Sequence, residues 1–422
     1  MPRAFRFVHA ADLHIDSRFV AWSGAPDQVR QTLLESTHRA FRNLVDLCIE
    51  REVAFLVVAG DVFDSADRGI RAQLRFRDGL AELARHGIPS FVSYGNHDPL
   101  DGWANSISFP KEVKIFGVAP EWAVVSGSDG PIAQVQGASY PTQEVRDNLA
   151  ARFAPPPDPV LYSVGVLHCN LGSDPAHANY APCTVSDLEA PGIDYWALGH
   201  IHRRQIVRAH APAIAYAGNS QGRDIQEAGP RGCYVVTVDE ARQATPEFVA
   251  LDVVRWARVE MSIGDAATLD ELIAMLDRKL SDVREAGDGR SMVCQVALTG
   301  RGAMHHELAR GDSTEQLLTH FRERFVAEEP WVWLDALEDR TLPDLDIGRR
   351  AEERDFLGLL LTRAVAGMTL TLQREALAAE LNAELRSGRD REWADQLSGA
   401  DVAGLIDRAR WLLAERLEGQ DR

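Results

Sequence analysis

The sequence predicts an α/β protein, in which a layered sandwich is followed by a small βαβαβ module and a helical region. Three observations lead to this prediction. Strand-like runs alternate with amphipathic helices over the first hundred residues, AFLVVAG at 54–60 is apolar throughout, as in a strand covered on both faces, and the strands become shorter after residue 110. Because 422 residues exceed one ordinary core, we expect three domains, at 1–250, 251–340 and 341–422.

The first elements follow a βαβαβ order. FRFVHA at 5–10 reads as a strand, and apolar residues at helical spacing predict a helix over 27–51. The strand at 54–60 comes next, then a second helix over about 69–86 that ends where Gly87 provides a C-cap. A third strand, IPSFVS, follows that glycine. This order indicates a sheet with helices packed on it.

The later elements fall into two groups. Short, turn-separated strands are expected at 113–118, 121–126, 132–139, 161–168, 194–200, 205–210, 213–218 and 233–238. The module from 251 is expected to alternate strands at 253–263, 292–300 and 331–338 with helices at 267–286 and 313–328. The remainder, from 344, is helix-like throughout.

The composition is that of a soluble globular protein, with 45% apolar and 26% charged residues. No apolar run reaches the length that spans a bilayer, and no signal-peptide core precedes the first strand, so we expect a cytoplasmic protein without membrane contact. The five cysteines form no C-x-x-C pair, so buried reduced thiols are expected. A net charge of −18 argues against a protein that simply coats nucleic acid, but not against an enzyme that binds it locally.

Five short polar stretches each lie where a predicted strand ends. They are DLH (Asp12, His14), GDVFD (Gly60 to Asp64), GNHD (Gly95 to Asp98), LHCN (His168) and GHIH (His200, His202). The carboxyl ends of strands in layered α/β folds share one edge, where ligands collect, so the five stretches can converge on one cleft. Asx turns produce single fragments of this kind, but five in this order are hard to explain as turns.

The chemistry of these side chains points to metal ions. Carboxylate, amide and imidazole donors without thiolates suit Mn²⁺, Fe or Zn²⁺ better than Ca²⁺ or a structural zinc. The donors are too many for one ion, and two cations about 3.5–4 Å apart are the usual arrangement for phosphoryl ester cleavage. We expect Asp12, His14, Asp61 and His202 around one ion, and Asn96, His168 and His200 around the other, with Asp61 bridging.

The GNHD stretch contains more than a turn requires. Asn96 would add no charge to the site, whereas His97 is expected to point towards the substrate phosphate. Asp98 would hydrogen-bond the other ring nitrogen of His97 and favour imidazolium, so these two residues are the predicted catalytic pair. For Asp64 two interpretations stay open, a position behind the metal ligands and a cap on the next helix.

Three more residues are predicted to bind substrate. Arg203 and Arg204 directly follow the ligand His202, so we expect phosphate contact near the metals. Asp16 is expected either behind the ligands or facing the substrate.

This set, from Asp12-x-His14 to Gly199-His200-x-His202, resembles the signature of calcineurin-like metallophosphoesterases, and is most similar to the SbcD-type DNA repair exonucleases. HAADLHID, GDVFD and YGNHD carry the resemblance over roughly the first 250 residues. The sequence has DLHID where that branch commonly has DLHLG. In this departure, at Asp16 and Ser17, it resembles a bacterial subgroup of the same nucleases, the YhaO-like proteins. The resemblance implies a four-layer α/β/β/α sandwich, a capping domain in the 251–340 module, DNA as substrate and an SMC-like coiled-coil ATPase as partner, with a homodimer as a further option.

The leading hypothesis is therefore a two-metal phosphodiesterase that cleaves DNA, as a DNA repair exonuclease using two divalent ions, Mn²⁺ first. One alternative is a phosphomonoesterase or small-nucleotide phosphodiesterase with the same site. The long C-terminal extension favours a polymer, because a small substrate needs no cap. Another alternative is a scaffold that works mainly by protein contact, against which the complete ligand set argues.

Overall fold

The computed structural model describes residues 4–17, 19, 24–64, 69–101, 107–127, 130–172, 178–345, 347–359, 361–362 and 371–387, and scattered positions between 401 and 417. The chain forms two compact units. The first is Met1–Arg258 with Asp282–Cys294 and Arg324–Asp335, and the second is Val259–Ser281, Gln295–Glu323 and Ala336–Arg422. The three-domain division stays a prediction.

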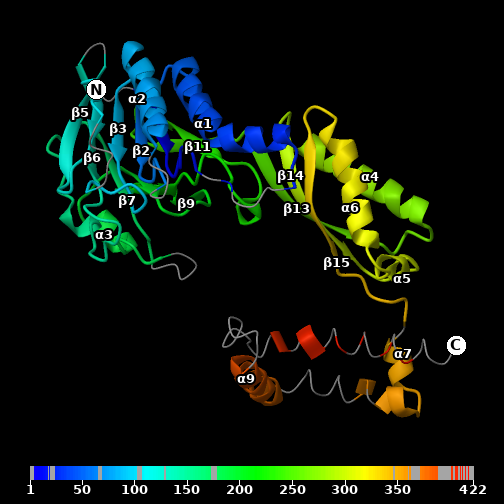
Figure 1. Cartoon of the computed structure of the whole chain (residues 1–422). Helices are drawn as coiled ribbons and strands as arrows, with labels where there is room; N and C mark the ends of the chain where they lie inside the picture. The colour runs from blue at the N-terminus through cyan, green and yellow to red at the C-terminus, as the bar shows by residue number, and fades with distance from the viewer. Residues whose placement is uncertain are drawn as a thin grey trace. The chain divides into compact units, whose positions relative to one another are not determined.

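The first unit contains two six-stranded sheets (Figure 1). The first sheet has the order β12 (Ala244–Ala250), β11 (Gly232–Val238), β1 (Phe5–Ala10), β2 (Phe55–Ala59), β3 (Ser90–Ser93) and β4 (Val113–Ile115). Strands β1 to β4 are parallel, and β11 and β12 join antiparallel at the β1 edge. The parallel strands therefore all end at the same edge of this sheet.

The second sheet has the order β5 (Glu121–Gly127), β6 (Gly130–Ala138), β7 (Tyr162–His168), β8 (Tyr195–Gly199), β10 (Ala213–Tyr216) and β9 (Gln205–Arg208). Strands β6, β7, β8 and β10 are parallel, while β5 and β9 are antiparallel edge strands. A set of four parallel strand ends thus lies at one edge of this sheet as well.

Side chains of β2 alternate between two hydrophobic cores. Phe55 and Val57 point into the core between the two sheets, and Leu56 and Val58 point into the core beneath the long helices. A strand buried on both faces can carry no polar residue, which explains the unbroken apolar run at 54–60.

Helices cover the outer faces of both sheets. Helices α1 (Asp27–Glu50) and α2 (Ile70–Arg85) pack on the first sheet through a shared core. The short helix α3 (Val185–Glu189) and the 3₁₀ turn at Ala150–Arg152 contribute Leu188 and Ala150 to the core on the second sheet. The predicted four-layer α/β/β/α sandwich is confirmed, with a fourth layer much thinner than the first.

The βαβαβ order predicted after residue 251 is also present. A three-stranded sheet has the order β13 (Val254–Ser262), β14 (Ser291–Thr299) and β15 (Val332–Asp339). Between these strands lie helices α4 (Leu269–Ala286), α5 (Met304–Leu308) and α6 (Ser313–Val326).

The C-terminal part contains helices α7 (Ile347–Ala351) and α9 (Thr371–Ser387). Part of the region from 344 that is predicted to be helical lies outside the described residues. A membrane-crossing helix is not found in the described part of the chain, because its helices are too short or too polar.

Candidate metal centre

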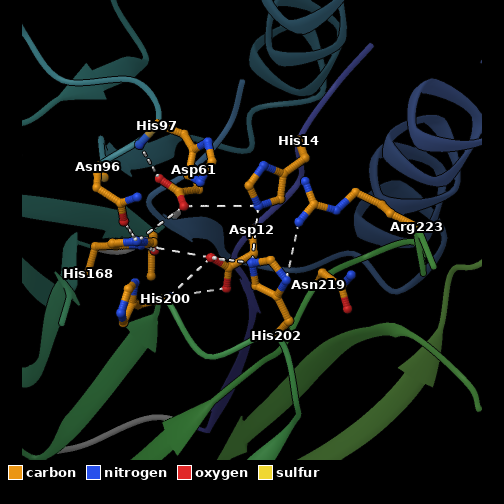
Figure 2. A network of polar contacts seen from close by, with 12 residues as sticks. Asp12, His14, Asp61, Asn96, His97, His168, His200, His202, Asn219 and Arg223 are labelled. Carbon is orange, nitrogen blue, oxygen red and sulfur yellow. Dashed lines mark hydrogen bonds and ion pairs between the residues drawn. The ribbon is translucent and has the colours of Figure 1, made fainter. Parts of the chain in front are cut away.

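The seven predicted metal ligands lie together at the carboxyl ends of five strands (Figure 2). The first sheet supplies Asp12 and His14 after β1, Asp61 after β2 and Asn96 after β3. The second sheet supplies His168, the last residue of β7, and His200 and His202 after β8. Parallel pairing explains the convergence, because β1 to β3 end side by side, as do β7 and β8.

One group of donors consists of Asp12, His14 and His202. One ligand atom from each lies within 4.8 Å of the others. The Nε2 atoms of the two histidines are 3.2 Å apart, and Oδ1 of Asp12 is 4.0 Å from Nε2 of His202. The two rings thus turn the same nitrogen towards one point.

A second group surrounds His168. Its Nε2 atom lies 3.0 Å from Oδ1 of Asn96 and 3.3 Å from Oδ2 of Asp61. Its Nδ1 atom is 3.0 Å from the carbonyl oxygen of Ala59, a contact that assigns the Nδ1 proton and leaves Nε2 as the donor to an ion. Oδ2 of Asp61 is also 4.0 Å from Nε2 of His14, so this carboxylate lies between the two groups.

His200 meets the site through both its backbone and its ring. Its backbone N–H donates to both oxygens of Asp12, at 3.1 and 3.3 Å. Nε2 of the ring is 2.8 Å from the carbonyl oxygen of Ala178, and the ring lies edge-on to His168 with centroids 5.2 Å apart. With Nε2 engaged by that carbonyl, Nδ1 is the ring nitrogen that can serve as a ligand.

Four of these residues have a left-handed backbone. The φ angles are 50° at Asp12, 44° at His14, 50° at Asp61 and 98° at His200. Such conformations cost about 1–3 kcal/mol each in a residue other than glycine, and they concentrate at functional sites. The fold therefore tolerates an unfavourable backbone conformation at these four residues, and this conformation directs their side chains into the site.

Gly95 permits the close approach of β3 to the centre. A Cβ atom there would lie 2.3 Å from Oδ1 of Asp61 and 2.8 Å from the His168 ring. Gly95 has to be a glycine for steric reasons, because both neighbours are fully buried and cannot move aside.

The expected hydrogen bond between Asp98 and the His97 ring is wrong. The carboxylate of Asp98 is fully buried and accepts backbone N–H groups from Val62, Phe63 and Gly95, at 2.7, 3.2 and 2.7 Å. The His97 ring instead has Nδ1 3.2 Å from Oδ1 of Asp64. Asp98 thus holds the backbone of the two turns that carry Asp61 and Asn96.

Asp64 connects several groups behind the ligands. Its Oδ1 atom accepts from Nδ1 of His14 at 2.7 Å, and its Oδ2 atom accepts from the hydroxyl of Ser17. Of the two interpretations left open from the sequence, the structure favours the position behind the ligands. Burial raises the pKa of Asp64, but hydrogen bonds from His14 and His97 outweigh burial and hold it well below its usual range.

Sequence reasoning missed two residues, Glu227 and Arg223. Oε1 of Glu227 is 2.6 Å from Nδ1 of His202, and its other oxygen accepts from the side chain of Asn219 and the backbone of Arg223. The Arg223 guanidinium lies 3.3 Å from Asp64 and 3.7 Å from Glu227, so one cation pairs with both carboxylates. The signal for both is the polar stretch NSQGRDIQE, which follows β10.

The three predicted substrate-binding residues lie in different surroundings. Asp16 accepts from Arg75 at 2.8 Å and is 3.4 Å from Arg71, both on α2, so its charge is compensated within the protein. Arg203 and Arg204 are exposed on the turn after His202. Their binding roles stay predictions.

The donors fit a pair of divalent cations. Burial raises the pKa of Asp12, whose ionised form has N–H donors but needs a compensating cation nearby. Burial acts in the same direction on Asp61, but without an ion a protonated His168, through its charge and its hydrogen bond, holds the Asp61 pKa well below its usual range. A cation bound at Nε2 would take the place of that proton. Buried carboxylate and amide oxygens together with imidazole nitrogens suit Mn²⁺, Fe or Zn²⁺.

Comparison with known proteins agrees with this geometry. Residues 5–204 match the calcineurin-like phosphoesterase family, and residues 256–342 match the middle domain of the metallophosphoesterase YhaO. A component of the nuclease SbcCD from Rhodobacter capsulatus is 34% identical over 97 residues, or 22% of each chain. The DNA double-strand break repair protein Mre11 of Thermoplasma acidophilum is 24% identical over 66% of this chain and 72% of its own length.

A third relative matches along almost the entire chain. The metallophosphoesterase YhaO of Bacillus subtilis is 32% identical over 417 residues, which are 98% of each protein. Together with the sandwich, the converging donors and the middle-domain match, this similarity identifies the chain as a metallophosphoesterase. Proteins of this class are hydrolases that act on phosphoester bonds. The chain belongs to the calcineurin-like metallophosphoesterases and, among them, to the YhaO family.

Proposed function

We propose that this protein is a two-metal phosphodiesterase that cleaves DNA, as a DNA repair exonuclease that works in the cytoplasm with an SMC-like coiled-coil ATPase. The observation that carries the proposal is the position of Asp61, whose Oδ2 atom lies within 4.0 Å of His14 in one donor group and of His168 in the other. A carboxylate in that position can serve two ions at once. The His97 ring lies at the rim of the same cluster, 5.0 Å from the His14 ring.

The residues take separate roles in this proposal. Asp12, His14 and His202 would hold one ion, Asn96, His168 and His200 would hold the other, and Asp61 would serve both. When bound, a pair of divalent cations supplies Lewis-acid activation of the phosphate and of the attacking water. Manganese is the first choice, with iron or zinc as alternatives.

His97 supplies the proton of the reaction. Burial lowers the pKa of His97, but its contact with Asp64 and the charge of Asp61 outweigh burial and raise it. A larger fraction of this half-exposed ring is therefore protonated near neutral pH. The protonated ring can stabilise charge on the phosphate and pass its proton to the leaving oxygen.

The names of the relatives support DNA as the substrate. Mre11 is named as a DNA double-strand break repair protein, and the relative from Rhodobacter capsulatus is named as part of the SbcCD nuclease. The acidic chain, with a net charge of −18, binds a polyanion more easily if a partner ATPase supplies part of the affinity.

The test compares three substrates with Mn²⁺ present and after removal by EDTA: linear duplex DNA, bis(4-nitrophenyl) phosphate and 4-nitrophenyl phosphate. We expect Mn²⁺-dependent release of nucleotides and cleavage of the diester, with a loss of roughly 10²–10⁴-fold in His97→Ala. The matched control is His86→Ala, which changes an exposed histidine at the C-terminal end of α2. Cleavage of the small esters alone would reject DNA as substrate, and full activity in His97→Ala and His200→Ala would favour a scaffold.

A further inference from the structure

A basic pocket of about 310 Å³ opens beside the candidate metal centre. Its lining includes the ligand His202 and three arginines, Arg203, Arg204 and Arg231, together with Asn219 and Phe248. Within the described chain no acidic side chain lines it. Such a concentration of positive charge stands out in a protein with a net charge of −18.

Arg231 forms the wall of the pocket. Its guanidinium donates to the carbonyl oxygens of His202 and Glu227, at 2.5 and 2.9 Å, and to the side chain of Asn219 at 3.0 Å. Most of its N–H groups are therefore used within the protein. Its charge still adds to the potential inside the pocket, while its hydrogen bonds hold the turn that carries the other two arginines.

Arg204 is fixed in place by an aromatic ring. Its guanidinium carbon lies 3.9 Å from the centroid of Phe248, and Nη1 donates to the carbonyl oxygen of Pro230 at 2.8 Å. A stacked guanidinium with one fixed hydrogen bond keeps its remaining N–H groups for a ligand.

Arg203 is different, because no carboxylate among the described residues pairs with its charge. The side chain is exposed, and across the part of the chain that the structure describes it forms no hydrogen bond or ion pair. An unpaired guanidinium between a fixed arginine and a metal ligand is suited to bind the oxygens of a phosphate.

The turn that carries these arginines is held rigidly. The backbone N–H of Asn219 donates to the carbonyl oxygen of His202 at 3.2 Å. Gly218, with a φ of 74°, approaches so closely that a Cβ atom there would lie 2.7 Å from the His202 oxygen and from the Arg204 nitrogen. Because one short turn carries both the ligand and the arginines, a phosphate in the pocket is placed at a fixed distance from the metal centre.

We propose that this pocket binds the phosphodiester next to the scissile one in a nucleic acid strand, with Arg203 as its main contact. The inference rests on the proposed function, since it assumes that the metal centre holds a phosphodiester of a strand. It extends that function by assigning a second phosphate subsite and therefore a preference for substrates with at least two linkages.

The experiment uses the Mn²⁺-loaded full chain and two substrates without terminal phosphates, a thymidine dinucleotide and a thymidine trinucleotide. The dinucleotide has only the scissile phosphate, whereas the trinucleotide also has the neighbouring one. We expect the wild type to prefer the trinucleotide in kcat/KM, and Arg203→Gln to lower that preference about tenfold, mainly through KM. Arg203→Lys keeps the charge and should retain part of the preference.

Arg208→Gln is the matched control. Arg208 lies in β9, pairs with Glu189 and is not part of the pocket, so this variant should keep the preference of the wild type.

A second measurement requires no turnover: the affinity for a fluorescent single-stranded 20-mer is measured by anisotropy over a salt series without metal. For Arg203→Gln we expect the slope of log K against log salt to become shallower by roughly 0.7, the value for one lost phosphate contact.

An unchanged preference together with an unchanged salt slope in Arg203→Gln would overturn the inference and leave the proposed function intact. A chain that cleaves bis(4-nitrophenyl) phosphate but neither binds nor cleaves any oligonucleotide would overturn both. If Arg208→Gln lowers the preference for the trinucleotide as much as Arg203→Gln does, the subsite is also rejected. The effect would then come from the loss of one positive charge anywhere on the protein and not from the pocket.

Discussion

The Nε2 atoms of His14 and His202 face each other across 3.2 Å. The opposite nitrogen of each ring lies against its own carboxylate, Asp64 at 2.7 Å and Glu227 at 2.6 Å. Both Nδ1 atoms therefore carry protons, and both Nε2 atoms are left to a shared electrophile. Arg223 pairs with the two carboxylates and thereby links the supports of two ligands from different sheets.

Replacing Glu227 by Gln should weaken metal binding without removing a ligand. The amide is a weaker acceptor for the His202 Nδ1 proton than the carboxylate, so the ring is less well oriented and less basic. We expect a loss of about 10–100-fold in Mn²⁺ affinity, measured by calorimetric titration of metal-free protein. Asp224→Asn, an equivalent change at an exposed neighbour that caps Gln226, should leave the affinity unchanged. Equal affinities of Glu227→Gln and wild type would refute this role.

Replacing Asp64 by Asn should lower the pKa of His97. Burial lowers that pKa, and the Asp64 contact is the first of the effects that raise it. If the protonated ring is the active form, activity falls as pH rises through the His97 pKa, so the variant should lose activity at a lower pH than the wild type. We expect both the His97 titration, followed by NMR, and the alkaline limb of the pH–rate profile to move to lower pH. Asp101→Asn, at an exposed position nearby, is the control, and a His97 titration that stays in place would contradict the assignment.

Gly95→Ala should disable the site through steric overlap. The added methyl group would displace Asp61 or His168, which lie 2.3 and 2.8 Å from its position. Displacements of this size at a catalytic centre cost roughly 100-fold in rate. Gly24→Ala, where no atom lies within 4 Å of the added methyl group, should have normal activity and thermal stability. Normal turnover in Gly95→Ala would contradict this prediction, because it would show that Asp61 and His168 can move aside without loss of activity.

His9 should make the fold sensitive to acid. Its ring is fully buried, with its nitrogens 3.0 Å from the Tyr195 hydroxyl and 3.2 Å from the Leu198 carbonyl, and burial lowers its pKa to about 3. Above pH 6.5 the ring is neutral in both the folded and the unfolded chain. Below pH 6.5 the unfolded chain binds a proton that the folded chain does not, so stability falls as pH decreases towards 3.

The expected contribution of His9 is a loss of about 3 kcal/mol in the free energy of unfolding between pH 7 and pH 4. Urea unfolding at both pH values measures it, and His9→Gln should show a smaller decrease than the wild type. The exposed His86→Gln serves as control, since it should show the wild-type decrease. A decrease in His9→Gln as large as in the wild type would assign the acid sensitivity to other groups.

The rule that polar residues follow buried strands was enough to find five ligand stretches from the sequence. It worked because a strand buried on both faces, such as β2, has to be apolar until its last residue and stands out from the ligand turn that follows. The same rule holds for a sixth strand, β10, which is parallel to β8 and leads to Asn219, Arg223 and Glu227. These residues were missed because none of them is a typical metal ligand within a short motif.

The partner of His97 shows where sequence reasoning fails. Asp98 is its neighbour along the chain, but the turn points the two side chains in different directions. The carboxylate that meets the His97 ring comes from Asp64, on the loop after another strand. Which of two carboxylates lies beside a ring depends on how adjacent strands are aligned, and local sequence does not encode that alignment.

The division of the ligands between two sheets has a consequence for how the protein is made. Asp12, His14, Asp61 and Asn96 leave the ribosome early, but His168, His200 and His202 emerge more than seventy residues later. A nascent chain therefore lacks three donors until residue 202 is synthesised, and both proposed ion sites stay incomplete until strands of both sheets have formed. A chain truncated before β7 would lack three of the seven proposed donors, at least one from each donor group.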